Sequence, residues 1–130
     1  MYIATKDRNL EGSTRLHLDV TNAINILVHE SETDEGETPG AVWDLFDPAD
    51  AEKLREYIWE QRKTNSDGGG QDPIHAQQTY LTEPMINELR CHGVRPFRVW
   101  QRLGEAVFIP AGWAHQVSFP RIICCGPTKK

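Results

Sequence analysis

The sequence has few cysteines, no long apolar run and no excess of positive charge, and each shortage excludes a class of protein. The three cysteines, Cys91, Cys124 and Cys125, are an odd number with two adjacent, which suits neither a disulfide framework nor a zinc knuckle. No apolar stretch approaches the length of a membrane span. The net charge of -5 gives no basic surface for a nucleic acid. We therefore expect one small domain in a reducing compartment, the cytosol or the nucleus.

A histidine and an aspartate lie two residues apart in the stretch 14–28, which the sequence predicts to be one continuous β segment. Residues i and i+2 of a strand point to the same face, so His17 and Asp19 would project together. The polar face would carry His17, Asp19, Thr21, Ala23 and Asn25, and the aliphatic face would carry Leu16, Leu18, Val20, Asn22, Ile24 and Ile26. We expect the aliphatic face to pack against a covering layer. Taken alone, the pattern also fits a half-exposed strand with both polar side chains in solvent.

A second histidine follows a Pro/Gly turn near the other end of the chain. The stretch 104–117 reads as a strand, a turn made by Pro110 and Gly112, and a second strand that begins near His115. A single histidine in such a place is usually structural. With His17 and Asp19, however, it would complete the set of two histidines and one carboxylate that binds Fe(II) and leaves three positions open.

Two helices are expected between these motifs. Asp47 and Pro48 are good N-cap and first-turn residues for a helix over 51–63. Thr82 is expected to cap a second helix over 82–91. Neither segment carries a pair of metal ligands, so we expect both helices to lie outside the β structure.

The remaining segments are expected to be short strands and loops. Strands are predicted at 41–46 and 97–103. The acidic stretch 29–41 and the glycine-bearing stretch 64–71 are expected to be solvated loops. His75, in a turn, is a further metal candidate, although a hydrogen-bonded structural histidine is the simpler interpretation.

These segments resemble a known family in both kind and order. The stretch 104–115 matches the second cupin signature: glycine, five residues, proline, one residue, glycine, two residues, histidine. Phe119 stands where that signature expects asparagine. Within the cupin superfamily the chain is similar to JmjC domains, most of all to the branch that demethylates lysine nine of the third core histone. The matching segments are 14–20, 23–25, 39–43, 50–53, 72–75 and 104–117.

The resemblance implies a mostly β fold with inserted helices, a partial double-stranded β-helix of the jelly-roll or cupin kind. It also implies an Fe(II)- and 2-oxoglutarate-dependent oxygenase that demethylates a methylated lysine of a histone tail in the nucleus. His17, Asp19 and His115 match the iron ligands of the family. Thr14 matches a position that contacts 2-oxoglutarate, and Asn25, expected on the same strand face, would line that pocket. Many JmjC domains anchor the far carboxylate with a lysine that has no match in 29–37.

The resemblance covers about residues 13–117, and the tail 118–130 departs from the family. The family closes its barrel with a strand after the last histidine, whereas here Pro120 and the run 124–127 replace most of it. Roughly five strands are too few for an eight-stranded roll. We therefore interpret residues 1–130 as a partial JmjC domain that is poorly stable and weakly active by itself. The alternatives are a non-catalytic JmjC-like chromatin or interaction module, a truncated remnant, or a plain cupin, although the long helical insert counts against the last.

Overall fold

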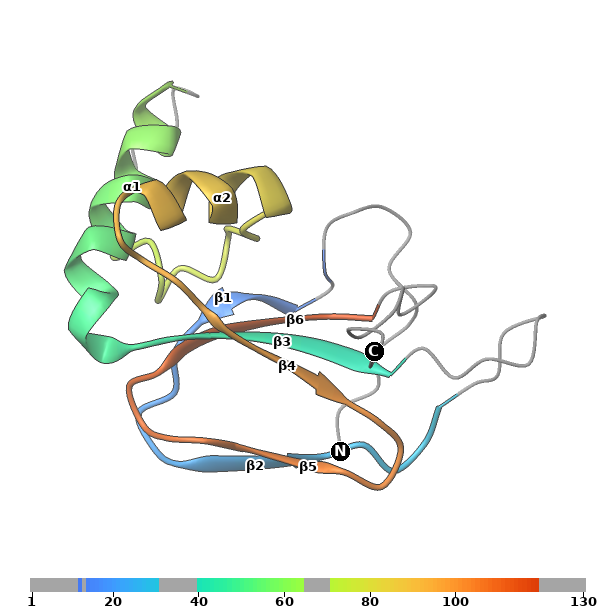
Figure 1. Cartoon of the computed structure of the whole chain (residues 1–130). Coiled ribbons are helices and arrows are strands. Elements are labelled where there is room, and N and C mark those ends of the chain that lie inside the picture. Colours follow the sequence, from blue (N-terminus) through green and yellow to red (C-terminus); the bar gives the residue numbers. More distant parts are fainter. Residues whose placement is uncertain (1–11, 13, 31–39, 65–70, 120–130) are drawn as a thin grey trace.

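Two antiparallel sheets and a helical layer make up the part of the chain that the computed structural model describes, which is residue 12 and residues 14–30, 40–64 and 71–119 (Figure 1). The larger sheet has four strands in the order β1-β6-β3-β4, and the smaller sheet pairs β2 with β5. The strands are β1 (Thr14–His17), β2 (Ala23–Ile26), β3 (Ala41–Phe46), β4 (Phe97–Gln101), β5 (Ala106–Ile109) and β6 (Ala114–Ser118). The expected fold class, a mostly β partial jelly roll with inserted helices, is confirmed.

An apolar core fills the space between the two sheets. Alternate residues of β3 point into this space, while the residues between them point to the helical side. The core consists of Ala41, Trp43, Leu45, Val107, Ile109 and Val117, with Ala23, Trp113 and Phe119 packed against it. The sheets therefore face one another as the two walls of an incomplete barrel.

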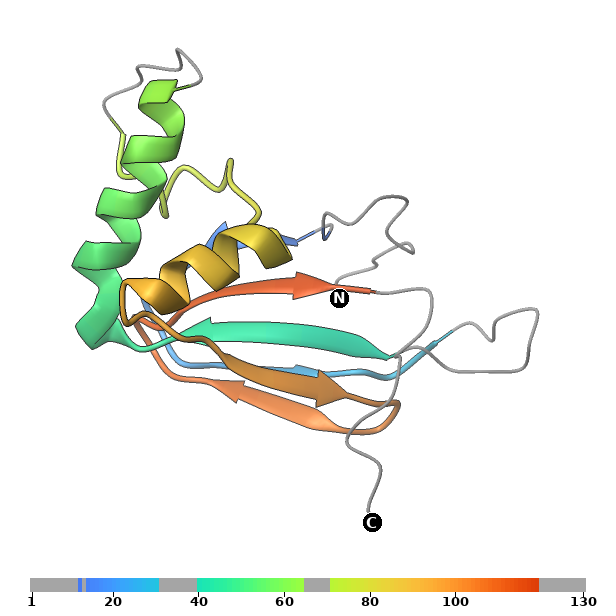
Figure 2. The ribbon, with the colours of Figure 1, turned by 45° about the horizontal axis from the view of Figure 1, so that its top comes forward.

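The helical layer covers the other face of the larger sheet (Figures 1 and 2). The layer begins with η1 (Pro48–Asp50), continues into α1 (Ala51–Thr64), and is completed by α2 (Glu83–Cys91). The expected cap at Asp47 is present, because its Oδ1 accepts a hydrogen bond of 2.8 Å from the backbone of Ala49. Thr82 occupies the N-cap position of α2 but makes no side-chain cap hydrogen bond. A second core cluster, which includes Leu16 and Phe46 from the sheet, lies beneath both helices.

The continuous strand expected over 14–28 is wrong. The chain leaves the larger sheet after His17 and enters the smaller sheet at Ala23, so one predicted strand is two strands in different sheets. The expected aliphatic face therefore does not exist: Leu16 is buried beneath the helices, whereas Val20 is 85% exposed and Ile24 is 67% exposed. Polar and apolar residues alternate on both sides of the crossover, and the single interruption at Asn22 and Ala23, where the chain enters the smaller sheet, was not recognised as a strand boundary.

Smaller differences concern the ends of the elements. β4 ends at Gln101, two residues before the expected end, and six strands are described where about five were expected. The two loops that were expected at 29–41 and 64–71 lie mostly outside the described residues, in 31–39 and 65–70, as does the tail from 120 onward.

None of the described helices has the length and apolar character that crossing a membrane requires.

Candidate metal centre

Two histidines and an aspartate meet where β1 and β6 lie side by side. His17 is the last residue of β1 and is paired directly with His115 of β6. Residues that are directly opposite in an antiparallel pair share a face of the sheet, and the two imidazole centroids are 4.2 Å apart. Asp19 follows in the crossover, with its Oδ2 at 4.0 Å from Nε2 of His115. One ligand atom from each of the three residues lies within 4.8 Å of the others.

The Pro/Gly turn and the crossover hold one another in place. The backbone nitrogen of Gly112 donates a 3.0 Å hydrogen bond to the carbonyl of Asp19. The backbone nitrogen of Ala111 donates a 2.8 Å hydrogen bond to Oδ1 of Asn22. Gly112 has a φ of +80°, in the left-handed region that favours glycine. The two motifs, far apart in the sequence, are thus joined by hydrogen bonds from the turn to the carbonyl of Asp19 and to the side chain of Asn22.

Both imidazole rings are oriented by a backbone carbonyl two residues earlier. Nδ1 of His17 lies 2.7 Å from the carbonyl oxygen of Arg15. Nδ1 of His115 lies 2.9 Å from the carbonyl oxygen of Trp113. A carbonyl can only accept, so each Nδ1 carries the proton and each Nε2 presents a lone pair. This is the tautomer in which Nε2 can bind a metal ion.

The environment of His115 favours the neutral imidazole. The residue is 3% exposed, and burial lowers its pKa below the ordinary value. The hydrogen bond to Trp113 and the carboxylate of Asp19 oppose this effect, while His17 adds to it. The ring also stacks on Trp43 at a centroid distance of 6.0 Å. A neutral imidazole is the form that coordinates a metal.

A β-bulge in β1 places Thr14 on the same face as His17. Thr14 pairs with Val117 and His17 pairs with His115, so three steps along β1 match two steps along β6. Val117 and His115 share a face of β6, so their two partners share that face as well. Without the bulge, an offset of three residues would have put Thr14 and His17 on opposite faces.

Asn25 is not on the strand that carries His17, so the expectation of a shared strand face is wrong. It lies on β2, in the smaller sheet. Its side-chain oxygen accepts a 3.2 Å hydrogen bond from Nε2 of Gln101, whose own oxygen accepts from Nε1 of Trp43 at 2.8 Å. This chain of hydrogen bonds connects Asn25 to the indole that stacks on His115.

His75 does not belong to the cluster. Its side chain is 54% exposed and lies 3.4 Å from Asp72, as a structural histidine of a turn would.

Two contributors to the site were missed at the sequence level. Trp43 lies on the same face of β3 as the buried residues Ala41 and Leu45, and this spacing of two could have placed it inside. Gln116 gave no such signal, because its role depends on distant partners. Its side chain accepts from the backbone nitrogen of Leu81 at 2.8 Å and donates to Asp44 at 3.2 Å. It therefore fixes the strand that carries the neighbouring His115.

Comparison with known proteins identifies the family. The sequence model of the family described as "JmjC domain, hydroxylase" matches residues 9–126. The chain therefore belongs to the JmjC domain family. Its relatives are demethylases by name: it is 34% identical to lysine-specific demethylase 3A-A of Xenopus laevis over 146 residues, and 33% identical to lysine-specific demethylase 3A of Homo sapiens over 149 residues. It is also 33% identical to lysine-specific demethylase 3 of Drosophila melanogaster over 142 residues.

These matches take in most of this chain but little of the relatives. They cover 88% of the chain for the Xenopus and human proteins and 82% for the Drosophila protein. The same matches span 11% of the Xenopus and human proteins and 16% of the Drosophila protein. The chain is thus equivalent to a small part of each relative.

Proposed function

We propose that this chain is the metal-binding part of an Fe(II)- and 2-oxoglutarate-dependent lysine demethylase. His17, Asp19 and His115 would be the iron ligands, and a methylated lysine of a histone tail, lysine nine of the third core histone, would be the substrate in the nucleus. The observation that carries the proposal is the convergence of the three side chains to within 4.8 Å. The names of the relatives support the choice of lysine demethylation.

The donor set fits Fe(II). Two imidazole nitrogens and one carboxylate oxygen are the ligands of the facial triad, which leaves positions open for a cosubstrate and oxygen. A structural zinc site would instead be closed by four protein ligands. When bound, the iron, with 2-oxoglutarate and dioxygen, supplies the oxidation that hydroxylates an N-methyl carbon. Demethylation by this chemistry would give formaldehyde and the free amine, with succinate and carbon dioxide as the products of 2-oxoglutarate.

The chain's own residues would hold and orient these parts. The carbonyls of Arg15 and Trp113 keep both imidazoles aimed through Nε2. The burial of His115 keeps solvent away from one side of the site. Thr14, which shares a face with His17, would contact 2-oxoglutarate. Asn25, linked through Gln101 to Trp43, would line the same pocket.

The test is turnover of a methylated peptide. The chain is incubated with Fe(II), ascorbate, 2-oxoglutarate and a histone-tail peptide methylated at lysine nine, and succinate and formaldehyde are measured. From the chain by itself we expect weak release of the two products in equal amounts, and the loss of this release in His17→Ala and Asp19→Ala. His75→Ala is the matched control, since it removes an exposed histidine outside the cluster and should keep the activity. Turnover that survives Asp19→Ala would contradict the proposal.

The second candidate is a non-catalytic JmjC-like module that binds another protein. The outer face of the β2–β5 sheet favours it, because Ile24, Ile26 and Phe108 are all more than half exposed there. Binding of iron and 2-oxoglutarate separates the two candidates. A non-catalytic module of this kind would bind neither.

A further inference from the structure

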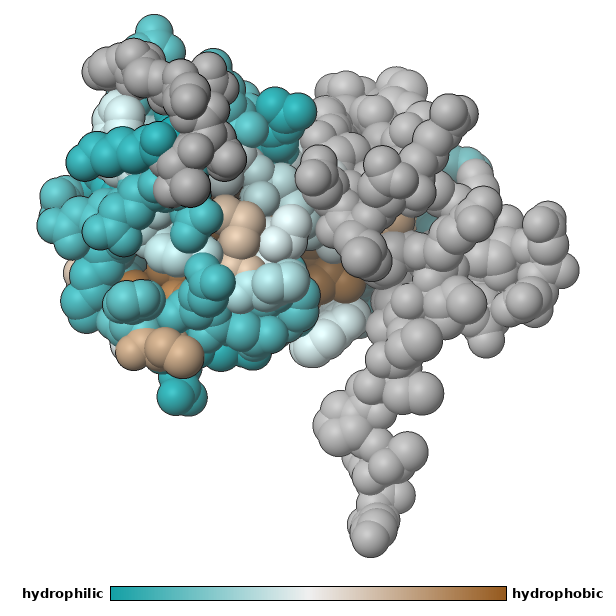
Figure 3. Space-filling model, turned by 90° about the horizontal axis from the view of Figure 1, so that it is seen from above, coloured by the Kyte–Doolittle hydropathy of each residue, from teal (hydrophilic) through white to brown (hydrophobic). Residues whose placement is uncertain are grey.

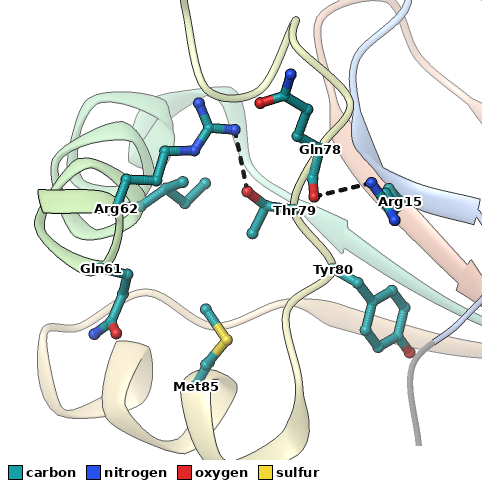
Figure 4. A pocket seen from close by; sticks show the side chains of 8 residues that line it. Arg15, Gln61, Arg62, Gln78, Thr79, Tyr80 and Met85 are labelled. Carbon is teal, nitrogen blue, oxygen red and sulfur yellow. Dashed lines mark hydrogen bonds between the residues drawn. The ribbon is translucent and has the colours of Figure 1, made fainter. Parts of the chain in front are cut away.

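A pocket lies on the helical side of the larger sheet, away from the core between the two sheets. It has a volume of about 230 Å³ and lies between α1, the start of α2, the first half of β1 and the connection that precedes α2. Figure 4 shows the lining side chains and the segments that carry them. The residues that line it are Arg15, Ile58, Gln61, Arg62, Gln78, Thr79, Tyr80 and Met85.

The bulge in β1 turns Arg15 toward this pocket. Arg15 and Leu16 lie between the two paired positions of β1 and together oppose the single residue Gln116. In such a bulge both residues lean to one side of the sheet. Leu16 is buried beneath the helices, which identifies that side as the helical one. Arg15 follows it there and donates from Nη1 to the carbonyl oxygen of Gln78 at 3.3 Å.

Arg62 approaches the same pocket from α1. Its Nη2 donates to Oγ1 of Thr79 at 3.3 Å and to the carbonyl oxygen of Pro73 at 3.5 Å. The two guanidinium groups are thus tied to neighbouring residues, Gln78 and Thr79, and both line the pocket, one on each side of the connection that carries these two residues (Figure 4). Each guanidinium has five N–H donors, and these bonds engage one nitrogen of each.

The charge of the pocket stands out against the rest of the chain. All eight lining residues belong to the described part of the chain, and none of them is acidic, although the whole sequence has a net charge of -5. Figure 3 shows that the helical side of the molecule is largely hydrophilic. Met85 is partly exposed and provides apolar surface within the pocket, whereas Ile58 is fully buried behind it. The lining therefore combines two fixed positive charges, amide and hydroxyl groups, and an apolar surface.

We propose that this pocket binds an oxyanion, a phosphate or a carboxylate group, between Arg15 and Arg62. Guanidinium groups match the planar arrangement of two oxygens in both anions, and such charge-assisted hydrogen bonds are the strong ones. The pocket has room for one such group with a short carbon stem, which would lie on Met85. This site uses no residue of the metal cluster and would act independently of it.

The test begins with inorganic phosphate. The chain, treated with a chelator so that metal binding plays no part, is titrated with phosphate and followed by NMR signals of Arg62 and Thr79. We expect saturable binding that weakens by about tenfold or more in Arg62→Gln and in Arg15→Gln. The matched control is Arg95→Gln, which removes one exposed arginine outside the pocket and should leave the affinity unchanged. Arg62→Lys, which keeps the charge but loses the planar fork, should also weaken binding.

Two further arms identify where the anion comes from. A peptide that carries phosphoserine and the same peptide with glutamate are compared with free phosphate. Tighter binding of one peptide assigns the pocket to a group carried on a peptide, and equal affinities assign it to a free anion. Binding that does not saturate, or that Arg95→Gln weakens as much as Arg15→Gln does, overturns the proposal. Phosphate affinity that is unchanged in the Arg15→Gln, Arg62→Gln double variant also overturns it. Asp19→Ala should leave phosphate binding intact, so failure here is distinct from failure of the metal site.

Discussion

His17 and His115 are held by the same local arrangement on two paired strands. In each case Nδ1 meets a carbonyl oxygen two residues earlier, so the backbone itself sets the ring orientation. No second side chain is needed to select the tautomer. The geometry of the centre therefore depends on how accurately β1 and β6 are paired, and changes that loosen this pairing should affect both histidines together.

The buried histidine should make stability depend on pH. Burial, helped by the nearby His17, lowers the pKa of His115, so the unfolded chain binds a proton more readily than the folded one. This contribution to stability is complete above the ordinary pKa of 6.5 and is lost as pH falls through the lower value of the folded state. Urea unfolding at a series of pH values from 8 to 5, in metal-free buffer, should show the decline.

The control for this prediction is a matched pair of histidine variants. His115→Gln should flatten the dependence between pH 8 and 5, because it removes the buried titrating group. His75→Gln should keep it, since that side chain is 54% exposed. An unchanged slope in His115→Gln would assign the pH dependence to another group.

At the scale of the elements, a buried polar network links β6, β3, β4 and the start of α2. Arg98 donates to both oxygens of Asp44, at 2.7 and 3.0 Å, and reaches Glu83 at 2.9 Å. Asp44 also accepts from Gln116, which in turn binds the backbone of Leu81. The network lies on the opposite face of β6 from His115 and holds that strand against the helical layer.

Removing a buried member of this network should lower the stability of the fold far more than removing an exposed member. Asp44 is 3% exposed, so Asp44→Ala leaves Arg98 and Gln116 without their partner and should destabilise the fold by about 3 kcal/mol. Glu83→Ala removes the exposed partner of the same arginine and should cost about 0.5 kcal/mol. Chemical denaturation measures both. Equal costs would show that the network is not what holds β6.

The turn before α2 depends on a single carboxylate. Asp72 accepts from the backbone of Ile74 and His75 and binds Arg55 at 2.7 Å. Burial raises the pKa of Asp72, but these hydrogen bonds outweigh burial and lower it from 3.8 to about 2. The contribution of this carboxylate to the stability of the fold is therefore complete above pH 3.8 and is lost as pH falls through about 2. Asp72→Ala should cost about 2 kcal/mol at pH 7 in urea unfolding, and a loss below about 0.5 kcal/mol would contradict this.

Elements whose ends depend on neighbouring residues could be predicted from the sequence better than elements that depend on residues far away along the chain. The helix after Asp47 is capped by its own neighbours, so its start could be predicted. The crossover between β1 and β2 could not, because it is held by hydrogen bonds from Ala111 and Gly112, about ninety residues away along the chain. The bulge that moves Thr14 beside His17 and turns Arg15 to the helical side is likewise a property of pairing with β6.

For the whole molecule, the two sheets are unequal within the described residues. The smaller sheet has only β2 and β5, and its outer face exposes Ile24, Ile26 and Phe108. A two-stranded sheet with an apolar outer face is marginal in water and exposes edges for association. We therefore expect the 130-residue chain by itself to unfold readily, to self-associate and to turn over 2-oxoglutarate weakly.

Substitution on that outer face tests the expectation. Ile24→Lys places a charge where the side chain is 67% exposed, so it should reduce self-association in light scattering without lowering the thermal midpoint. Leu54→Lys is the contrast, because it buries the same charge beneath the helices and should prevent folding. High stability and robust turnover by the unmodified chain would contradict the expectation.

The most direct test of the central claim is a metal titration of the chain and its variants. Calorimetry with Mn(II) as an air-stable substitute for Fe(II) should give one ion per chain, bound by His17, Asp19 and His115. Asp19→Ala should weaken the binding by at least about a hundredfold, while His75→Ala should leave it unchanged. An affinity in Asp19→Ala equal to that of the unmodified chain would contradict the assignment of the metal centre.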